Sequence, residues 1–478
     1  METAFFVQSP PGRDLKCRDI TQVARLDLRK EAGTLRTLLL VLWLLIPAML
    51  FAQNPNEEDT SSDIAAQSSG GPLSMSFKNR PSLRIGEFAN VDLKTKWYFD
   101  FRGFHPGIWN PPGVVAPLPS TPPTFLLTRA RVELKGKITK YFDYAIERDM
   151  RRTLGQDHEY HPWKDNYGNL TLNRWLQFKV GKIKMPFGME EIGSEERLDY
   201  AIKSPVSDNL TPGHERGAVL HGSLLKGNRL DYEAGVFRFD GENSDIHGVP
   251  TGQRTYAARF IGEPLRYVKL LPKTIRHTYF GLAMTEGRMF EGLNGVKGST
   301  FSGLTYFGHV YVNGNRTRIG TETAWSEGPF SIKGEYVRMS EERKREGIRG
   351  EDLPDKISRG WYVSGAWMAL GKMKSKGKAP KRPLLPGLGF GAVELQARYD
   401  VLAFFSAPGP GLPSRSPRAP VILPNNERTW TVGPTWYLNR FMKIQINGQR
   451  QRLTDIEKKA VLGINLFYTG IIRLQLDM

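Results

Sequence analysis

Basic residues at alternate positions are the clearest candidates for chemistry in this sequence. Between residues 126 and 138, apolar or small residues alternate with a charged set: Arg129, Arg131, Glu133, Lys135 and Lys137. In a β-strand this period of two places the charged set on one face. Such cationic groups bind phosphate and carboxylate oxygens, and rings of them give a pore its anion selectivity. The pattern predicts an anion-conducting ladder; the alternative is a solvated face of paired charges, such as Glu133 beside Arg131.

A second charged stretch, residues 189–215, lacks alternation and follows a predicted strand that ends near Gly188. Its acidic residues are Glu190, Glu191, Glu195, Glu196 and Asp199, and the basic residues in or next to it are Arg197, Lys203 and Arg216. We expect this stretch to fold into a pore as a constriction loop, with Lys203 and Arg216 on the anion path. Its acids would create a mixed field, suited to zwitterions or general solutes. The alternative is a helical surface loop with acids at the helix N-terminus.

Motifs of enzymes and metal sites are weak. His158 and His161 are three residues apart in a polar stretch, unlike the helical HExxH pattern of zinc proteases. In residues 295–300 a lysine precedes the glycine, so a phosphate-binding P-loop is not formed. Residues 387–391 are glycine-rich but open a predicted strand rather than a helix. We therefore expect no enzymatic activity, no cofactor and no metal.

The elements that must position the basic ladder are short strands. The chain is 40% apolar and 24% charged, with a mean hydropathy of −0.41, which excludes a bundle of membrane helices. A membrane β-barrel fits, because only every second strand residue faces lipid. Alternation recurs from residue 82 to 478, for example in residues 230–236 and 393–400. The sequence predicts an all-β fold: a transmembrane antiparallel β-barrel of about 16 strands. A soluble β-sandwich shows the same alternation and is the alternative.

Alternation also marks the last strand. The apolar residues Ile472, Leu474, Leu476 and Met478 alternate with polar residues up to the final position. Soluble domains tend to fray at their ends. A strand that reaches the final residue therefore favours a barrel in which this strand closes against the first one.

Three proline-rich stretches interrupt the strands: residues 105–124, 372–387 and 407–426. Proline lacks the donor that a sheet ladder needs, so we expect loops here. Long loops lie on the extracellular side of outer-membrane barrels. The sequence thus predicts all three stretches on that side.

The N-terminal region indicates export. The apolar run of residues 37–52 follows basic residues, ends at Ala52 and is too short for a spanning helix. It fits a cleaved signal peptide with a long N-terminal region. We assign residues 1–52 to the signal peptide, 53–81 to a flexible polar leader and 82–478 to the barrel. An N-terminal membrane anchor is the alternative.

Export limits the partners of the chain. Cleavage after Ala52 removes seven basic and five acidic residues from totals of 67 and 49, which leaves a net charge of +16. It also removes Cys17, the only cysteine, so stability must come from a source other than disulfides, and a closed barrel provides one. Nucleic acid is not an expected partner, because the basic residues are spread along the strands of an exported chain.

Five stretches, taken in order and spacing, resemble the phosphate-selective porin O and P family across residues 82–478. They are residues 128–136 with 141–144 and Asp149, 180–188 with Ser194 and 216–217, 235–241, 334–338 with 360–363, and 436–439 with 473–478. The resemblance implies a sixteen-stranded barrel, usually a homotrimer, with a positively lined channel narrowed by infolded loops. It also implies assembly by the outer-membrane insertion machinery.

The family's phosphate-binding members line the constriction with arginine and lysine. The resemblance places Arg129 at one of these positions and Lys203 at another. Two other positions differ: Glu87 stands where the family has an arginine, and Glu195 stands where a lysine follows Ser194. Met478 replaces the usual terminal phenylalanine.

Together these observations predict an outer-membrane porin of a Gram-negative bacterium. We expect a passive channel through a basic lumen for small anions, phosphate or polyphosphate among them, with outer-membrane lipid around it. Alternatives are a general or zwitterion channel without phosphate specificity, a secreted β-rich binding protein, and a barrel-embedded hydrolase.

Overall fold

The computed structural model describes residues 73–77, 80–105, 124–152, 161–225, 230–303, 305–374, 379–384, 387–414, 422–455 and 465–478. The chain divides into two units, and the first, Met1–Pro55, lies outside these residues. All described elements belong to the second unit, Asn56–Met478. The predicted signal peptide and most of the predicted leader therefore fall outside the described part of the chain.

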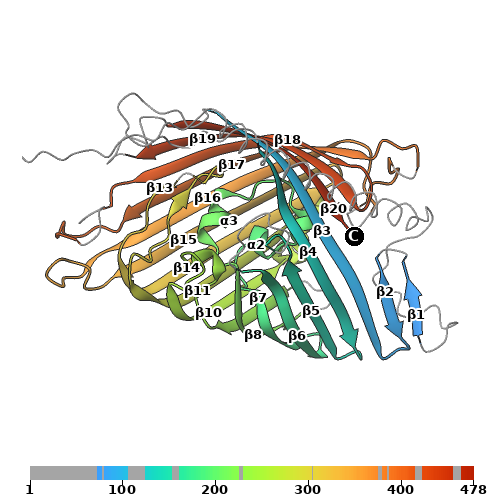
Figure 1. Ribbon diagram of the computed structural model, residues 1–478, viewed down its shortest axis with the longest axis horizontal. Helices are drawn as coiled ribbons and strands as arrows, with labels where there is room; N and C mark the ends of the chain where they lie inside the picture. Colours follow the sequence, from blue (N-terminus) through green and yellow to red (C-terminus); the bar gives the residue numbers. More distant parts are fainter. Residues whose placement is uncertain are drawn as a thin grey trace, which may run out of the picture. The chain divides into compact units, whose positions relative to one another are not determined.

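Sixteen antiparallel strands form the wall of a barrel (Figure 1). In chain order they are β3 (Ala89–His105), β4 (Thr124–Ile138), β5 (Phe142–Asp149), β6 (Trp163–Asn173), β7 (Leu176–Lys184), β8 (His214–Ser223), β9 (Leu230–Phe237), β10 (Gly252–Gly262), β11 (Tyr279–Gly292), β14 (Val312–Glu327), β15 (Phe330–Arg343), β16 (Leu353–Leu370), β17 (Ala392–Ser406), β18 (Asn425–Tyr437), β19 (Met442–Asp455) and β20 (Leu466–Asp477). Each strand pairs with the next along the chain.

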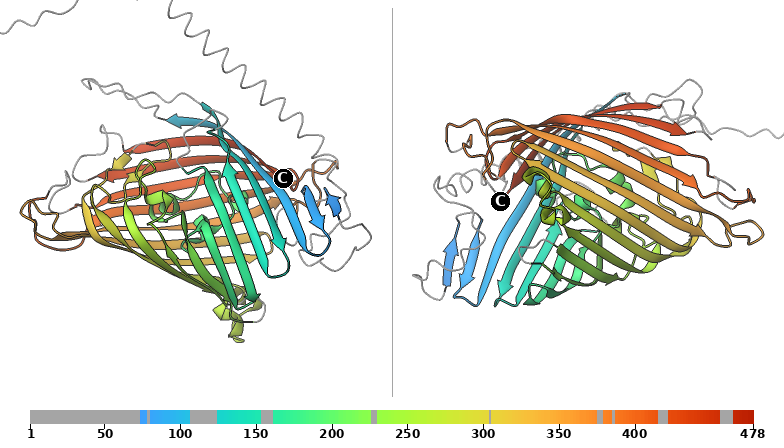
Figure 2. Two further views of the ribbon diagram at one scale, coloured as in Figure 1. Left: turned by 60° about the horizontal axis from the view of Figure 1, so that its bottom comes forward. Right: turned by 180° about the vertical axis from the view of Figure 1, so that it is seen from behind.

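The barrel closes where β20 pairs antiparallel with β3. Ile472 lies opposite Phe101, Leu474 opposite Phe99 and Leu476 opposite Trp97. The backbone ladder continues past β20, because Met478 and Thr95 exchange two hydrogen bonds of 2.8 and 3.0 Å. This closure leaves no free edge among the sixteen strands, and it confirms the predicted antiparallel barrel (Figure 2).

Alternating side chains separate the two faces of the wall. In β11, Phe280, Leu282 and Met284 are exposed, whereas Ala283 and Thr285 on the other face are buried. The exposed apolar face points outward and the buried face points into the barrel, as a lipid-facing wall requires. Among the described residues, no helix is long and apolar enough to span a membrane.

The two ends of the barrel differ in their connections. Short turns at one end are residues 139–141, 174–175, 328–329 and 438–441. Longer segments at the other end include residues 185–213, 238–251 and 293–311. These segments carry the short helices α2 (Met189–Ile192), η1 (Glu195–Arg197), α3 (Pro205–Leu210) and η2 (Glu242–Ser244), and a small hairpin of β12 (Gly298–Ser299) and β13 (Thr305–Phe307).

One predicted loop lies at the opposite end from that expected. Residues 372–387 join β16 to β17, and Leu370 pairs with Val393 beside the short turn at Pro329, whose carbonyl accepts from Met368 N. This connection is therefore at the short-turn end, as is the segment with η3 (Pro264–Tyr267) and α4 (Lys273–Arg276) between β10 and β11. Proline content indicated a loop correctly, but it carries no information about the end of the barrel to which the loop belongs.

The predicted leader contains a described strand. Within residues 53–81, β1 (Leu73–Ser76) pairs antiparallel with β2 (Ser82–Ile85), and β2 pairs with the start of β3. The sheet therefore begins earlier than residue 82. The sequence missed β1 because its four residues are too few to show a pattern.

Candidate functional site

One segment of the chain turns into the barrel and divides its interior. Residues 185–213, which we call the inner loop, connect β7 to β8, and their helices α2 and α3 lie inside the ring of strands (Figure 1). Gly188 has a φ of 81°, which favours glycine where the chain leaves the strand direction. Ser204 caps α3, accepting a hydrogen bond from Val206 N at 3.2 Å, and Pro205 begins the helix. This placement agrees with the prediction that the stretch folds inward; that it constricts the channel stays a prediction.

Charged side chains of the opposite wall hold the α2 and α3 side of the inner loop. Arg398 of β17 binds Glu190 at 3.2 Å and also donates to the carbonyl of Ile202 at 3.1 Å. Asp400 accepts from Ser204 Oγ at 2.5 Å. A carboxylate oxygen of Glu335 on β15 accepts from the backbone N–H groups of Met189 and Glu190. These contacts fix the loop across the lumen.

Polar side chains of the closing strands hold the other side by its backbone. Lys443 and Gln445 of β19 both donate to the carbonyl of Leu198, at 2.9 and 3.1 Å. Asn447 accepts from Ala201 N at 2.8 Å. The inner loop is therefore fastened to β15, β17 and β19 at several points along its length.

Glu195 of the inner loop lies between the two arginines of the β4 ladder. Its Oε2 atom is 2.9 Å from Arg129 Nε and 3.0 Å from Arg131 Nη1. Arg131 also contacts Asp149 at 3.2 Å. Burial acts to raise the pKa of Glu195, but Arg129 and Arg131 outweigh it and hold that pKa well below its usual range. Glu195 is therefore ionised at neutral pH, and it balances part of the arginine charge.

Other charges of the inner loop are paired in the same way. Lys203 Nζ lies 2.9 Å from Glu191, and Lys94 Nζ of β3 lies 2.7 Å from Glu196. Burial acts to lower the pKa of Lys203, but Glu191 and Glu195 outweigh it and raise that pKa. The site is thus a mixed field of alternating charges rather than a bare basic ring.

The lower half of the ladder is more open. Lys135 and Lys137 share the face of Arg129 and Arg131, because the pairing of β4 with β5 is regular from Arg131 to Ile138. Both lysines are exposed, and neither forms an ion pair with a described residue. The ladder therefore changes from paired arginines beside the inner loop to accessible lysines toward the short-turn end.

A buried cluster of charges and an apolar core fill the part of the interior next to β14 and β15. Asp240 lies 2.5 Å from Arg316 and 2.7 Å from Arg318, and all three side chains are at most 1% exposed. Around them pack apolar residues from the inner loop, the β12–β13 segment and the wall, including Phe187, Leu210, Phe307, Val337 and Phe404. Burial acts to raise the pKa of Asp240, but Arg318 and Arg316 lower it. The interior is therefore partly a protein core.

We expect a substitution in this charge cluster to have a large effect on the stability of the protein. Changing Asp240 to Asn should lower the free energy of unfolding by about 3 kcal/mol, because two buried arginines lose their shared carboxylate. The free energy of unfolding is measured by urea titration, with the loss of the fast-migrating folded band on unboiled gels as the readout. The exposed-loop variant Asp352→Asn is the control, and equal stability of the two variants would contradict the assignment.

Arg216 lies elsewhere than expected. On β8 it shares a face with Ala218 and Leu220, and this face is the outward one because Val219 packs inside with Phe237 and Ala257. Arg216 therefore points away from the lumen, and the expectation that it lines the anion path is wrong. The sequence analysis grouped Arg216 with the inner loop, but Arg216 already belongs to β8. In a strand, alternate residues face opposite sides, and Arg216 falls in the outward set.

Sequence reasoning missed several residues of the site. Lys94 and Lys96 of β3 face the interior, and Lys96 Nζ lies 2.7 Å from Glu147. Their alternation with Leu93, Thr95 and Trp97 was the available signal. Arg398 lies in a strand that was predicted, but its contact with the inner loop joins distant parts of the chain and leaves no local pattern.

Most of the weak metal motif lies outside the described residues. Of residues 158–161 the structure describes His161, whose Nε2 lies 3.1 Å from Asp245. Within the described ranges, no group of three or more potential ligands could hold a metal ion.

Comparisons with known proteins agree with this architecture. The model of the family described as phosphate-selective porin O and P matches residues 123–267 and 296–469. A search of curated proteins found no match. Among solved structures, the in-vitro folded outer membrane protein OmpT of Vibrio cholerae is 9% identical, with a TM-score of 0.50 over 82% of this chain and 98% of that chain.

Two further solved structures align over similar lengths. The outer membrane channel DcaP of Acinetobacter baumannii is 10% identical, with a TM-score of 0.49 over 82% of this chain and 98% of that chain. OprB of Pseudomonas putida is 9% identical, with a TM-score of 0.46 over 81% and 94%. At such low identity the likeness to OmpT shows the fold alone.

Proposed function

The chain belongs to the phosphate-selective porin O and P family, and from this premise we propose that it forms a passive outer-membrane channel biased toward small anions. The family and the closed sixteen-stranded barrel make it an outer-membrane porin. The anion bias is our inference. It is carried by one observation: the β4 ladder presents two arginines beside the inner loop and two exposed lysines beyond it.

An anion crossing this site exchanges water for fixed donors. Lys135 and Lys137 attract it electrostatically, and the guanidinium groups of Arg129 and Arg131 offer planar sets of donors at the narrowing. Glu195 already accepts from both arginines, so an entering anion competes with a tethered carboxylate. This competition weakens binding and favours rapid passage of small anions over tight capture of phosphate.

The second candidate is a general or zwitterion channel. The pairing of Glu191, Glu195 and Glu196 with Lys203, Arg129 and Lys94 favours it, because alternating charges attract both ends of a zwitterion. Reversal potentials in planar bilayers across a salt gradient separate the two. An anion-selective potential supports the first candidate, and equal permeability of both ions leaves the second.

Glu195 gives a direct test of the competition. Changing Glu195 to Gln should increase anion preference and strengthen block of chloride current by added phosphate, because Arg129 and Arg131 lose their ionic partner. The control is Glu263→Gln, which removes one negative charge at the short-turn end, where Glu263 pairs with Arg266. If both variants behave like the unchanged protein, Glu195 does not compete with anions.

The N-terminal region and the ends of the barrel bear on how the protein reaches the membrane and how it is oriented there. We propose export with cleavage of residues 1–52, assembly by the outer-membrane insertion machinery and association as a homotrimer. The long loops then lie outside the cell and the short turns in the periplasm, as in related barrels. N-terminal sequencing of the mature protein and migration of the unboiled oligomer on gels test these points.

A further inference from the structure

Three arginines form a row on the outward face of the barrel. Arg216, Arg238 and Arg254, which we call the arginine row, lie on or beside the long-loop ends of β8, β9 and β10 and are exposed. Arg238 N donates to the carbonyl of Arg216 at 2.9 Å. Pairing of Phe237 with Thr255 places Arg254 next to Arg238 across the strands. The three side chains are therefore neighbours at one level of the wall.

Such a row is unfavourable by itself. Neighbouring strands are about 4.8 Å apart, and like charges opposite each other destabilise a sheet. No described carboxylate forms an ion pair with these three side chains. The nearby Glu242 is shared by Lys164, Lys182 and His214. The arrangement therefore calls for an anion from outside the described residues.

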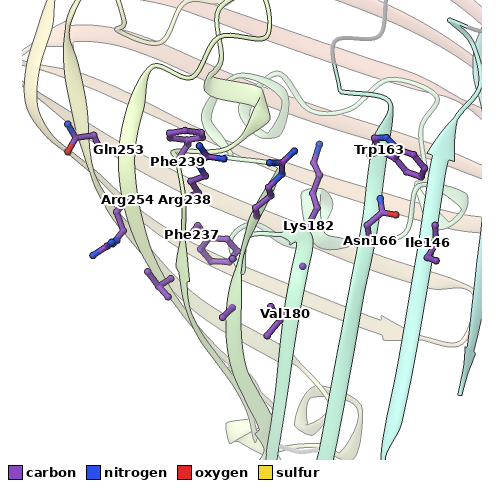
Figure 3. Close-up of a pocket in the computed structure, with 15 residues that line it drawn as sticks. Ile146, Trp163, Asn166, Val180, Lys182, Phe237, Arg238, Phe239, Gln253 and Arg254 are labelled. Atoms are coloured by element: carbon purple, nitrogen blue, oxygen red, sulfur yellow. The ribbon is translucent and has the colours of Figure 1, made fainter. Parts of the chain in front are cut away.

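Apolar side chains lie directly beside the row. Two residues further along the same faces stand Ala218, Val236 and Tyr256, and Val180 follows Lys182 in the same way. These positions belong to an open hollow of ≈ 1280 Å³, except Tyr256, which flanks it. Trp163 and Phe239 also line the hollow, and Figure 3 shows Val180 further along the wall than Lys182 and Arg238. The hollow thus offers cationic groups above an apolar floor.

A similar arrangement recurs on the other side of the barrel. Arg428 of β18 lies opposite Arg452 of β19, and both are exposed on the outward face beside Trp430. Tryptophan prefers the level where lipid headgroups meet hydrocarbon. Outward arginines at the long-loop ends of distant strands therefore point to a common surrounding partner rather than to one protein contact.

We propose that the arginine row binds the phosphate of a phosphorylated lipid in the outer leaflet, with its acyl chains against Val180, Ala218 and Val236. Arginine forms charge-assisted hydrogen bonds to phosphate oxygens, and basic surfaces of membrane proteins bind anionic headgroups. The inference relies on the proposed membrane orientation, but not on the anion bias of the lumen, because the row faces away from it.

The test uses detergent-solubilised full-length protein and lipid A in bisphosphorylated and dephosphorylated forms. Native mass spectrometry should show the bisphosphorylated form bound to the unchanged protein. The triple variant Arg216→Gln, Arg238→Gln and Arg254→Gln should bind it roughly a hundredfold more weakly, since each basic side chain contributes about one kcal/mol at an anionic surface. The dephosphorylated form should bind weakly to both proteins.

A matched control removes the same charge at the short-turn end. The variant Lys140→Gln, Arg174→Gln and Lys372→Gln should keep full lipid binding. Both triple variants should keep the reversal potential of the unchanged channel, which shows an intact barrel and separates this inference from the proposed function. Equal binding by the row variant, equal binding of dephosphorylated lipid A, or cysteine crosslinking of residue 216 to a second copy would overturn the proposal.

Discussion

Changing Arg129 and Arg131 to Glu should turn an anion-selective reversal potential into a cation-selective one. Both side chains contact Glu195 of the inner loop, so the substitution places three carboxylates where two guanidinium groups and one carboxylate now meet. Rings of acidic side chains select cations. Planar bilayers with a salt gradient measure the sign directly. A potential unchanged from that of the original protein would mean that ions do not pass this site.

Two further variants keep that experiment decisive. Arg131 is 5% exposed and packs beside Asp149, so its reversal to glutamate also strains folding. The milder pair Arg129→Gln and Arg131→Gln should shift the potential in the same direction by a smaller amount. Arg174→Glu, at a short turn, should leave it unchanged.

Replacing residues 190–203 of the inner loop by a short Gly-Ser linker should raise single-channel conductance severalfold. The removed segment lies inside the ring of strands, where Glu195 contacts Arg129 of β4 and the carbonyl of Leu198 accepts from Lys443 of β19. Resistance of a pore is dominated by its narrowest section, so widening that section has the largest effect. Ion selectivity should fall at the same time, because ions pass further from the wall charges.

Insertion of the same linker between Gly328 and Pro329 is the control for that deletion. This turn joins β14 to β15 at the short-turn end, away from the inner loop. The conductance of this insertion variant should equal that of the unchanged channel. If the deletion also leaves conductance unchanged, the inner loop does not limit the flow of ions.

Local patterns predicted the wall of the barrel well. Alternation in residues 126–138 identified β4 and the common face of its basic residues, since side-chain direction in a strand depends only on parity. Loss of alternation after Gly188 located the inner loop. Both features are encoded within about ten consecutive residues, so they can be predicted without knowing which distant parts of the chain are in contact.

Other features depend on residues far apart in the chain. The contacts of Glu195 with Arg129 and of Arg398 with Glu190 join segments that no pattern links. The outward position of Arg216 follows from the strand boundary at His214, which sequence places too late. The apolar core joins Phe404 of β17 to Phe187 of the inner loop, and no pattern within either segment shows that the two meet.

The way in which β19 holds the inner loop has a consequence for how such a channel can change. Lys443 and Gln445 donate to main-chain carbonyls, and Asn447 accepts from a main-chain N–H. Every amino acid supplies these groups, so the contacts of the inner loop with these three residues of β19 do not depend on which side chains the loop carries at Leu198 and Ala201. We therefore expect that substitutions of the inner-loop side chains at these positions leave the attachment of the loop to β19 in place.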